Sequence, residues 1–302
     1  MAKIGIFDSG YGGLTILEAI RRELPQYDYL YLGDNARAPY GTHSFDVIYR
    51  YTLQAVKYLF SQDCALVILA CNTASAKALR TIQQKNLPSL QGGAGGRLVN
   101  VLGVIRPTVE AVPAITKTGH IGILATPATV SSESYVLELE KLSVSKAVCQ
   151  QSGLYSVSPQ GGLIITQQAC PLWVPLIENG EHLNPGADYF VDLYLRQILE
   201  KDPQIDTLIL GCTHYPLLLP KISQWIRNNG KRFAASDIQV ISQGYLEAKS
   251  LADYLVRHPE YASQLSQGGS CRYLTTENAD RFSQSASLFL SSPVQAEHID
   301  LE

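Results

Sequence analysis

The sequence predicts an α/β protein built from two pseudo-symmetric domains, each with a parallel sheet. Short apolar runs alternate with helical patterns, which is typical of a parallel sheet covered by helices. Runs such as Leu66–Leu69 are apolar throughout, which indicates strands that are buried on both faces. Some segments of the first half also resemble segments of the second half, which indicates an internal duplication.

The first half alternates strands and helices from its beginning. We predict strands at KIGIFD, DYLYLGD and ALVILACNTAS, and helices at GLTILEAIRREL, DVIYRYTLQAVKYLF and AKALRTIQQ. In the first of these helices Leu14, Leu17, Ile20 and Leu24 share one face. A glycine-rich surface loop is expected from Ser89 to Leu98, because this stretch has little to bury.

The pattern then restarts, and two pairs of segments match across the halves. IGIF at 4–7 has a counterpart in IGIL at 121–124, and LACNT at 69–73 has one in LGCTH at 210–214. The second pair is the more informative, because each half has a strand that ends in a small residue, a cysteine and a polar residue. From about Ile238 the chain is expected to return to the first domain. The predicted domains are therefore residues 1–103 with 238–302, and residues 104–237.

Composition limits the classes of function. The chain has 302 residues, 46% of them hydrophobic and 17% charged, with a net charge of −3. This suits a globular protein and gives no bulk attraction for nucleic acid or for an anionic membrane. There is no signal-peptide pattern and no apolar run long enough for a transmembrane helix. The cysteines are dispersed without C-x-x-C spacing, so we expect reduced thiols in a cytoplasmic protein.

Polar residues follow four of the predicted strands. In open parallel sheets, ligands gather beyond the carboxyl ends of the strands, so we expect these residues on one edge, forming a site. They are Asp8-Ser9-Gly10, Gly33-Asp34, Cys71-Asn72-Thr73 and Cys212-Thr213-His214.

The glycines at positions 10, 12 and 13 lie between a strand and a helix. They fit neither G-x-G-x-x-G nor the P-loop pattern, so a tight turn is favoured over dinucleotide binding. Such a turn gives a ligand access to backbone N–H groups, and a carboxylate could use these donors.

Two of the cysteines stand out. Cys71 lies at the start of a predicted helix, where the dipole and the free N–H groups favour a thiolate. His214 follows Cys212 by two residues, so in an extended chain both side chains point the same way. Ordinary alternatives remain: His214 as a packed histidine, Asp8 as the N-cap of the next helix, and a zinc site from scattered strand ends. The other cysteines, Cys64, Cys149, Cys170 and Cys271, are expected to be structural.

Five ordered motifs between residues 4 and 219 resemble glutamate racemases, within the aspartate/glutamate racemase family. They are IGIFDSGYGGLTIL, YLGDNARAPYG, LVILACNTASA, ACPLWVPLIENG and LILGCTHYPLL. The later stretch YLTTENADRFSQSASLFL is similar to the end of the family's sequences. The resemblance implies two pseudo-symmetric α/β domains with the active site in the cleft between them, usually in a homodimer.

The resemblance also implies roles for individual residues. Cys71 and Cys212 correspond to paired acid/base thiols, Asp8 and His214 to residues that assist them, and Glu178 to an acidic residue at the edge of the site. The positions expected to bind the amino acid are Asp8, Ser9, Tyr40, Gly41, Asn72, Thr73, Thr213 and His214. No metal and no cofactor are implied.

The implied activity is the interconversion of L- and D-glutamate without pyridoxal phosphate, which supplies D-glutamate for peptidoglycan in a bacterial cytoplasm. The first alternative is an aspartate racemase or another racemase of the family. A cysteine hydrolase and a non-catalytic amino-acid-binding protein are alternatives from other classes. The sequence departs from the family in the glycine-rich residues 91–98, at Asn179, and at ISQG in 241–244.

Overall fold

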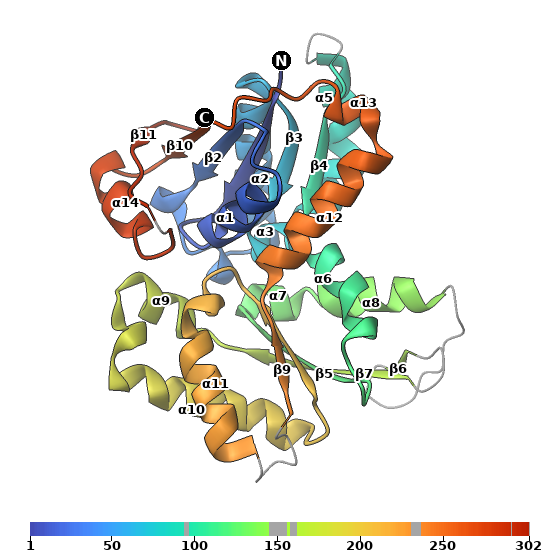
Figure 1. The fold of residues 1–302 in the computed structure, drawn as a ribbon, viewed down its shortest axis with the longest axis vertical. Helices are drawn as coiled ribbons and strands as arrows, with labels where there is room; N and C mark the ends of the chain where they lie inside the picture. The colour runs from blue at the N-terminus through green and yellow to red at the C-terminus, as the bar shows by residue number, and fades with distance from the viewer. Residues whose placement is uncertain (94–96, 145–155, 158–161, 231–236, 291, 302) are drawn as a thin grey trace. The chain divides into compact units, whose positions relative to one another are not determined.

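A computed structural model describes the chain except residues 94–96, 145–155, 158–161, 231–236, 291 and 302 (Figure 1). Its internal contacts divide the chain into two units, Met1–Val104 with Gly244–Glu302 and Ile105–Gln243. In the described part of the chain, every helix is too short or too polar to cross a membrane.

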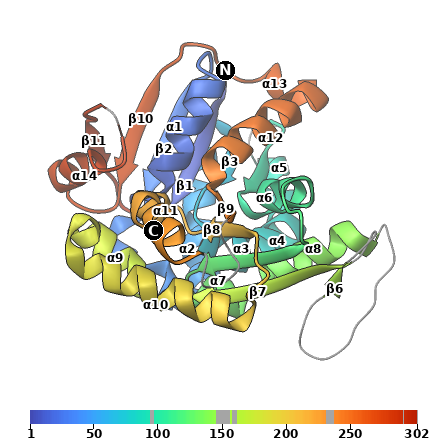
Figure 2. The same ribbon diagram turned by 60° about the horizontal axis from the view of Figure 1, so that its bottom comes forward.

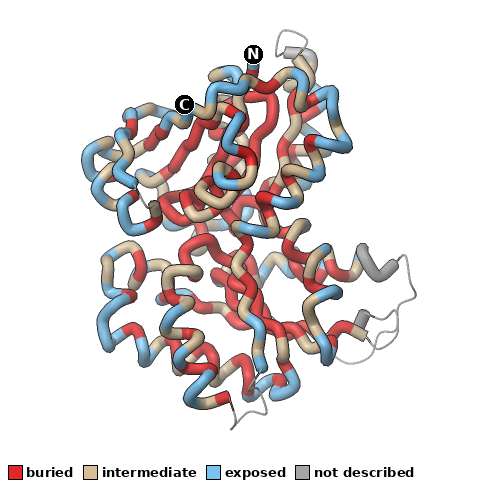
Figure 3. Tube along the Cα trace, viewed as in Figure 1, coloured by how far each residue is buried: buried red, intermediate tan, exposed pale blue. Residues whose placement is uncertain are grey.

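The first unit contains a six-stranded sheet in the order β11-β10-β2-β1-β3-β4, and every pair of neighbours is parallel. The strands are β1 (Lys3–Asp8), β2 (Tyr29–Gly33), β3 (Cys64–Leu69), β4 (Asn100–Gly103), β10 (Cys271–Thr275) and β11 (Ala296–His298). All residues of β2 and β3 are buried, which confirms the prediction made from their apolar runs (Figure 3).

Two helices connect the central strands of this sheet. Helix α1 (Gly13–Glu23) connects β1 to β2, and α2 (Phe45–Ser61) connects β2 to β3 on the other side of β1. Right-handed crossovers that run in opposite directions place their helices on opposite faces of the sheet. The predicted apolar face of α1 is confirmed, since Leu14, Leu17 and Ile20 are fully buried.

The remaining helices of the first unit follow β3 or lie before and after β10 in the chain. They are α3 (Asn72–Lys77), α4 (Leu79–Thr81), the π-helical η3 (Ile82–Asn86), α5 (Leu87–Gly93), α12 (Gln243–Arg257), α13 (Pro259–Ala262) and α14 (Ala279–Ala286). The loop expected from Ser89 to Leu98 is therefore wrong for residues 89–93, which belong to α5. The helical run continues through the π turn, and Gln91 Nε2 donates to the carbonyl of Val99 at 3.1 Å. Residues 94–96 lie outside the described part.

The second unit contains a five-stranded sheet in the order β6-β7-β5-β8-β9. The strands are β5 (His120–Ala125), β6 (Ser156–Val157), β7 (Leu163–Ala169), β8 (Thr207–Gly211) and β9 (Gln239–Ile241). The prediction of a parallel sheet holds except at β6, which pairs antiparallel with β7. Because β9 pairs with β8, the second unit extends beyond the boundary drawn at residue 237 and includes residues 238–243.

Helices surround the strands of the second unit, and α10 packs against β7 (Figure 2). They are α6 (Ile105–Ala111), α7 (Pro127–Ser131), α8 (Ser134–Val144), α9 (Trp173–Glu178), α10 (Pro185–Lys201) and α11 (Leu219–Asn229).

The two sheets share one topology over four strands. The order β2-β1-β3-β4 in the first unit corresponds to β7-β5-β8-β9 in the second. The matched segments 4–7 and 121–124 lie in β1 and β5, and the two cysteine segments lie at the ends of β3 and β8. This agreement supports the internal duplication.

A glycine in β5 tests the close packing of the second sheet. A Cβ added to Gly122 would lie 2.5 Å from Leu208 Cδ2 and 3.0 Å from Ile198 Cδ1. We expect Gly122→Ala to lower the free energy of unfolding by about 1–3 kcal/mol, because the core is overpacked. Gly186→Ala in α10 is the matched control, since nothing lies within 4 Å of its added Cβ. Thermal unfolding of both variants measures the difference, and an equal effect would contradict the packing argument.

Candidate active site

The first half of the candidate site lies at the carboxyl ends of β1 and β3. From β1 the chain continues to β2 on one side, and from β3 it continues to β4 on the other, so the strand order reverses between β1 and β3. Open α/β sheets bind ligands at such a reversal. Asp8 is the last residue of β1, Cys71 closely follows β3, and the N–H of Ala70 donates to the carbonyl of Phe7 at 2.8 Å. The expectation that all four polar strand ends share one edge is wrong, because Cys212 follows a strand of the second sheet.

Cys71 is a buried thiol at the start of a helix, as the sequence predicted. It is the N-cap of α3, and its Sγ accepts the N–H of Ala74 at 3.5 Å. The Ser9 hydroxyl lies 3.3 Å from the same sulfur. Asn72 and Thr73 are the buried first residues of the helix. Donors of this kind stabilise a thiolate relative to a thiol.

Asp8 shapes the glycine turn rather than capping α1. Its Oδ2 accepts the N–H of Gly10 at 2.9 Å, whereas the N-cap of α1 is Gly12. The alternative in which Asp8 is the N-cap of the next helix is therefore wrong. A Cβ added at Gly13 would lie 2.5 Å from Asp8 Cβ, so only glycine lets the helix approach the carboxyl group this closely. The Tyr31 hydroxyl fixes the same turn by donating to the carbonyl of Gly10 at 2.8 Å.

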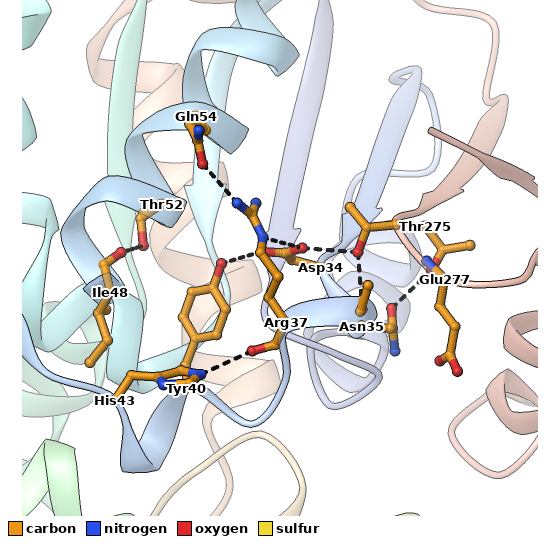
Figure 4. Close-up of polar contacts among 12 residues, drawn as sticks. Asp34, Asn35, Arg37, Tyr40, His43, Ile48, Thr52, Gln54, Thr275 and Glu277 are labelled. Atoms are coloured by element: carbon orange, nitrogen blue, oxygen red, sulfur yellow. Dashed lines mark hydrogen bonds and ion pairs between the residues drawn. The ribbon is translucent and has the colours of Figure 1, made fainter. Parts of the chain in front are cut away.

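Tyr40 and Gly41 also belong to this half. They lie in the 3₁₀-helix η2 (Tyr40–Thr42), which contacts α3. The Tyr40 ring is buried 6.2 Å from the ring of Phe7, and its hydroxyl donates to Asp34 (Figure 4).

The second half is a chain of three polar side chains in the second unit. Cys212 directly follows β8, and its Sγ lies 3.9 Å from Nδ1 of His214. Nε2 of His214 lies 3.0 Å from Oε1 of Glu178, which is the last residue of α9. Cys212, Thr213 and His214 are buried, and the Glu178 side chain is 25% exposed. Sequence reasoning did not find the contact between Glu178 and His214.

The surroundings of His214 favour its charged form. Burial lowers its pKa, but hydrogen bonds to Cys212 and Glu178 and the negative charges of both raise it to about 10. At neutral pH the ring is therefore an imidazolium, a positive charge beside the Cys212 sulfur.

The position of Glu178 depends on how α9 ends. Gly180 has a left-handed φ of 74°, a common way to terminate a helix, and Asn179 Nδ2 donates to the carbonyl of Pro175 at 2.8 Å. Asn179, a departure from the family pattern, thus closes the helix that presents Glu178. The Trp173 ring packs at 83° on the Tyr215 ring, with 4.8 Å between centroids, and joins this helix to the segment that follows Cys212.

Tyr135 and Gln243 support the end of β8, and sequence reasoning missed this role. Gln243 Nε2 donates to Thr108 Oγ1 and to the Tyr135 hydroxyl, each at 3.0 Å. A Cβ at Gly211 would meet Tyr135 Cε2 at 3.3 Å, so the ring packs directly against the residue before Cys212. The only signal in the sequence was the unusual glutamine of ISQG.

Of the other cysteines, two are buried, one is partly exposed and one lies outside the described part. Burial raises the pKa of Cys64 to about 12 and raises that of Cys170 well above its usual value. Cys271 in β10 is partly exposed, and Cys149 lies outside the described residues. Among the described residues, no three His, Cys, Asp or Glu side chains are grouped as metal ligands would be.

A model of the Asp/Glu/Hydantoin racemase family matches residues 14–242. The chain belongs to this family. A glutamate racemase of Ruegeria sp. (strain TM1040) is 38% identical, in an alignment that covers 97% of this chain and 98% of the relative. A glutamate racemase of Koribacter versatilis is 33% identical, in an alignment that covers 99% of this chain and 97% of the relative.

Solved structures of racemases share the whole fold. Glutamate racemase isoform RacE1 from Bacillus anthracis superposes with a TM-score of 0.78 at 29% identity, covering 99% of this chain and 98% of that chain. The glutamate racemase of Francisella tularensis, solved in complex with D-glutamate, superposes with a TM-score of 0.76 at 28% identity. The superposition covers 100% of this chain and 97% of that chain. The chain is thus a racemase with the two-domain parallel α/β fold that the sequence predicted.

In this racemase the charge on His214 can be tested by its titration. The ring is expected to titrate near pH 10, and Glu178→Gln is expected to lower that pKa, because one of the two raising groups is lost. The pKa of His214 in the folded protein lies above its unfolded value of about 6.5. The contribution of the charged ring to the free energy of unfolding is therefore complete below about pH 6.5 and is lost as the pH rises through about 10. NMR titration of the ring gives the measurement. Glu181→Gln is the control, since this exposed carboxylate bonds Asn184 instead; equal shifts in both variants would refute the assignment.

Proposed function

We propose that this racemase interconverts L- and D-glutamate by a two-base mechanism with Cys71 and Cys212 as the bases. One observation carries the proposal: each sheet has a buried cysteine just beyond the carboxyl end of the corresponding strand, β3 or β8. The names of the relatives, which are glutamate racemases, support the choice of substrate.

In the proposed reaction one thiolate removes the Cα proton, and the other thiol delivers a proton to the opposite face. The electron pair of the broken C–H bond is held in a carbanionic intermediate and then forms the new C–H bond. The reaction starts from one thiolate and one thiol and ends with the roles exchanged, so the reverse direction uses the opposite state. No redox step and no cofactor enter this balance.

The neighbours of each sulfur set this protonation balance. The imidazolium of His214, held by Glu178, stabilises a thiolate at Cys212. At Cys71 the N–H of Ala74 does so, and the Ser9 hydroxyl lies 3.3 Å from the sulfur. Asp8 ends the adjacent strand, β1. We assign Asp8 and His214 as assistants of Cys71 and Cys212, respectively.

The amino acid is proposed to bind through polar groups that surround the two cysteines. Hydrogen-bond donors at the α-carboxylate would stabilise the charge that develops when the Cα proton leaves. The proposed binding residues are Asp8, Ser9, Tyr40, Gly41, Asn72, Thr73, Thr213 and His214.

The proposed product, D-glutamate, would supply peptidoglycan synthesis in a bacterial cytoplasm. We further propose that the enzyme acts as a homodimer without a metal, a nucleic acid or a membrane as partner.

Replacing either cysteine tests the two-base mechanism. Cys71→Ser and Cys212→Ser are each expected to reduce racemisation by about 10²–10⁴-fold, because a hydroxyl is a far weaker base at neutral pH. Loss of optical rotation of L-glutamate measures the rate. Cys271→Ser is the control, since this cysteine begins β10, at the edge of its sheet opposite the carboxyl end of β3, and it should retain the wild-type rate. Full activity in either of the first two variants would rule out the mechanism.

Isotope exchange separates the alternatives. In heavy water the wild-type enzyme should introduce deuterium at Cα of glutamate as the rotation falls. Exchange with aspartate but not glutamate would identify an aspartate racemase. Glutamate binding without exchange would identify a binding protein, and a hydrolysis product would identify a cysteine hydrolase.

A further inference from the structure

A buried carboxylate organises the segment that follows β2. Asp34 is fully buried, and it accepts hydrogen bonds from Arg37 Nε at 2.9 and 2.7 Å and from the Tyr40 hydroxyl (Figure 4). It also accepts one from Thr276 Oγ1 at 2.9 Å. The donors come from η1 (Asn35–Arg37), from η2 and from the residue after β10. A buried charge is tolerated only when it is paired and bonded in this way.

Arg37 anchors this cluster to α2. Its Nη1 donates to Gln54 Oε1 at 2.7 Å, and its guanidinium lies 4.1 Å from the centroid of the Tyr51 ring. His43 Nε2 lies 3.2 Å from the carbonyl of Arg37, which ties the far end of the segment back to its start. Residues 35–43 are therefore fixed to α2, to the end of β2 and to the end of β10.

The Tyr40 side chain is fully engaged within this cluster. Its ring is buried, and burial together with the Asp34 charge raises the pKa of the hydroxyl far above its usual value. The hydroxyl donates its proton to Asp34, so it is not the group that meets a ligand. The backbone of Tyr40 and the partly exposed Gly41 remain, and η2 contacts the helix capped by Cys71.

We propose that Asp34 and Arg37 are positioning residues that hold Tyr40 by its hydroxyl, so that the backbone of Tyr40–Gly41 is preorganised for a carboxylate of the amino acid beside Cys71. The inference rests on the proposed function, in which these two residues bind substrate. It changes the role of Tyr40: the tyrosine acts through Asp34, and its side chain does not touch the substrate. A loop that is fixed beforehand loses less conformational entropy on binding.

Tyr40→Phe removes one hydroxyl and leaves the ring, so it isolates this bond. We expect amide hydrogen exchange in residues 35–43 to become faster and KM for glutamate to rise about tenfold, with kcat within about twofold, because a hydrogen bond to a charged group is lost. Tyr49→Phe is the matched control: its hydroxyl donates to Asn86 Oδ1 at 2.8 Å in the same unit. That variant should change neither KM nor exchange in residues 35–43.

A second variant, Arg37→Lys, keeps the positive charge but cannot reach Asp34 and Gln54 together, so it should change KM and exchange in the same direction. Unchanged exchange in Tyr40→Phe would show that the hydroxyl does not hold the segment. Faster exchange with unchanged KM, whatever kcat does, would reduce the cluster to a structural role. Either result overturns the positioning proposal while the proposed function stands. A wild-type enzyme that does not racemise glutamate would instead overturn the proposed function, and this inference with it.

Discussion

The reversal of strand order beside β1 and beside β5 is the constraint on which both halves of the candidate site depend. The chain leaves β1 toward β2 and leaves β3 toward β4, on opposite sides, and it leaves β5 and β8 in the same way. The connections that follow the two neighbouring strands therefore diverge, and the carboxyl ends between them stay accessible to a ligand. Asp8 and Cys71 lie at the first reversal, and Cys212 lies at the second. The turn that follows β1 depends on two further features: Gly13 has no side chain, which lets α1 approach Asp8, and the Tyr31 hydroxyl donates to the carbonyl of Gly10.

The two thiols have corresponding positions but different electrostatic surroundings. The Cys71 sulfur lies beside the Ser9 hydroxyl and accepts a backbone N–H, whereas Cys212 lies beside a histidine that is charged at neutral pH. Enantiomers have equal free energy, so the overall reaction does not demand matched bases. Under the proposed mechanism the two thiols exchange the roles of base and acid in each turnover, so unlike surroundings are compatible with it.

The sequence predicted the features that short segments encode. Apolar runs identified β1, β2, β3, β5 and β8, and the cysteine motifs marked the ends of two of them. Features that depend on distant contacts were not predictable. The glycine-rich composition concealed the continuation of α5 through residues 89–93, and β9 is assigned to its sheet only by pairing with β8. Glu178 and His214 are 36 residues apart and meet because α9 ends at Glu178, two residues before the left-handed Gly180.

The segments after β2 and β7 show how the duplicated units diverged. After β2, the ion pair of Arg37 with the buried Asp34 fixes the chain. The hydrogen bonds to Asp34 must offset the free-energy cost of removing the two charges from water. After β7, the carbonyl of Cys170 accepts the Tyr215 hydroxyl at 3.0 Å, and Trp173 packs on the same tyrosine ring, so aromatic burial supplies the stabilisation. Both arrangements hold a loop beside a cysteine-bearing strand end, yet they require unrelated residues. The similarity between the halves is therefore confined to strands and strand ends, because only the sheet imposes the same demands on both.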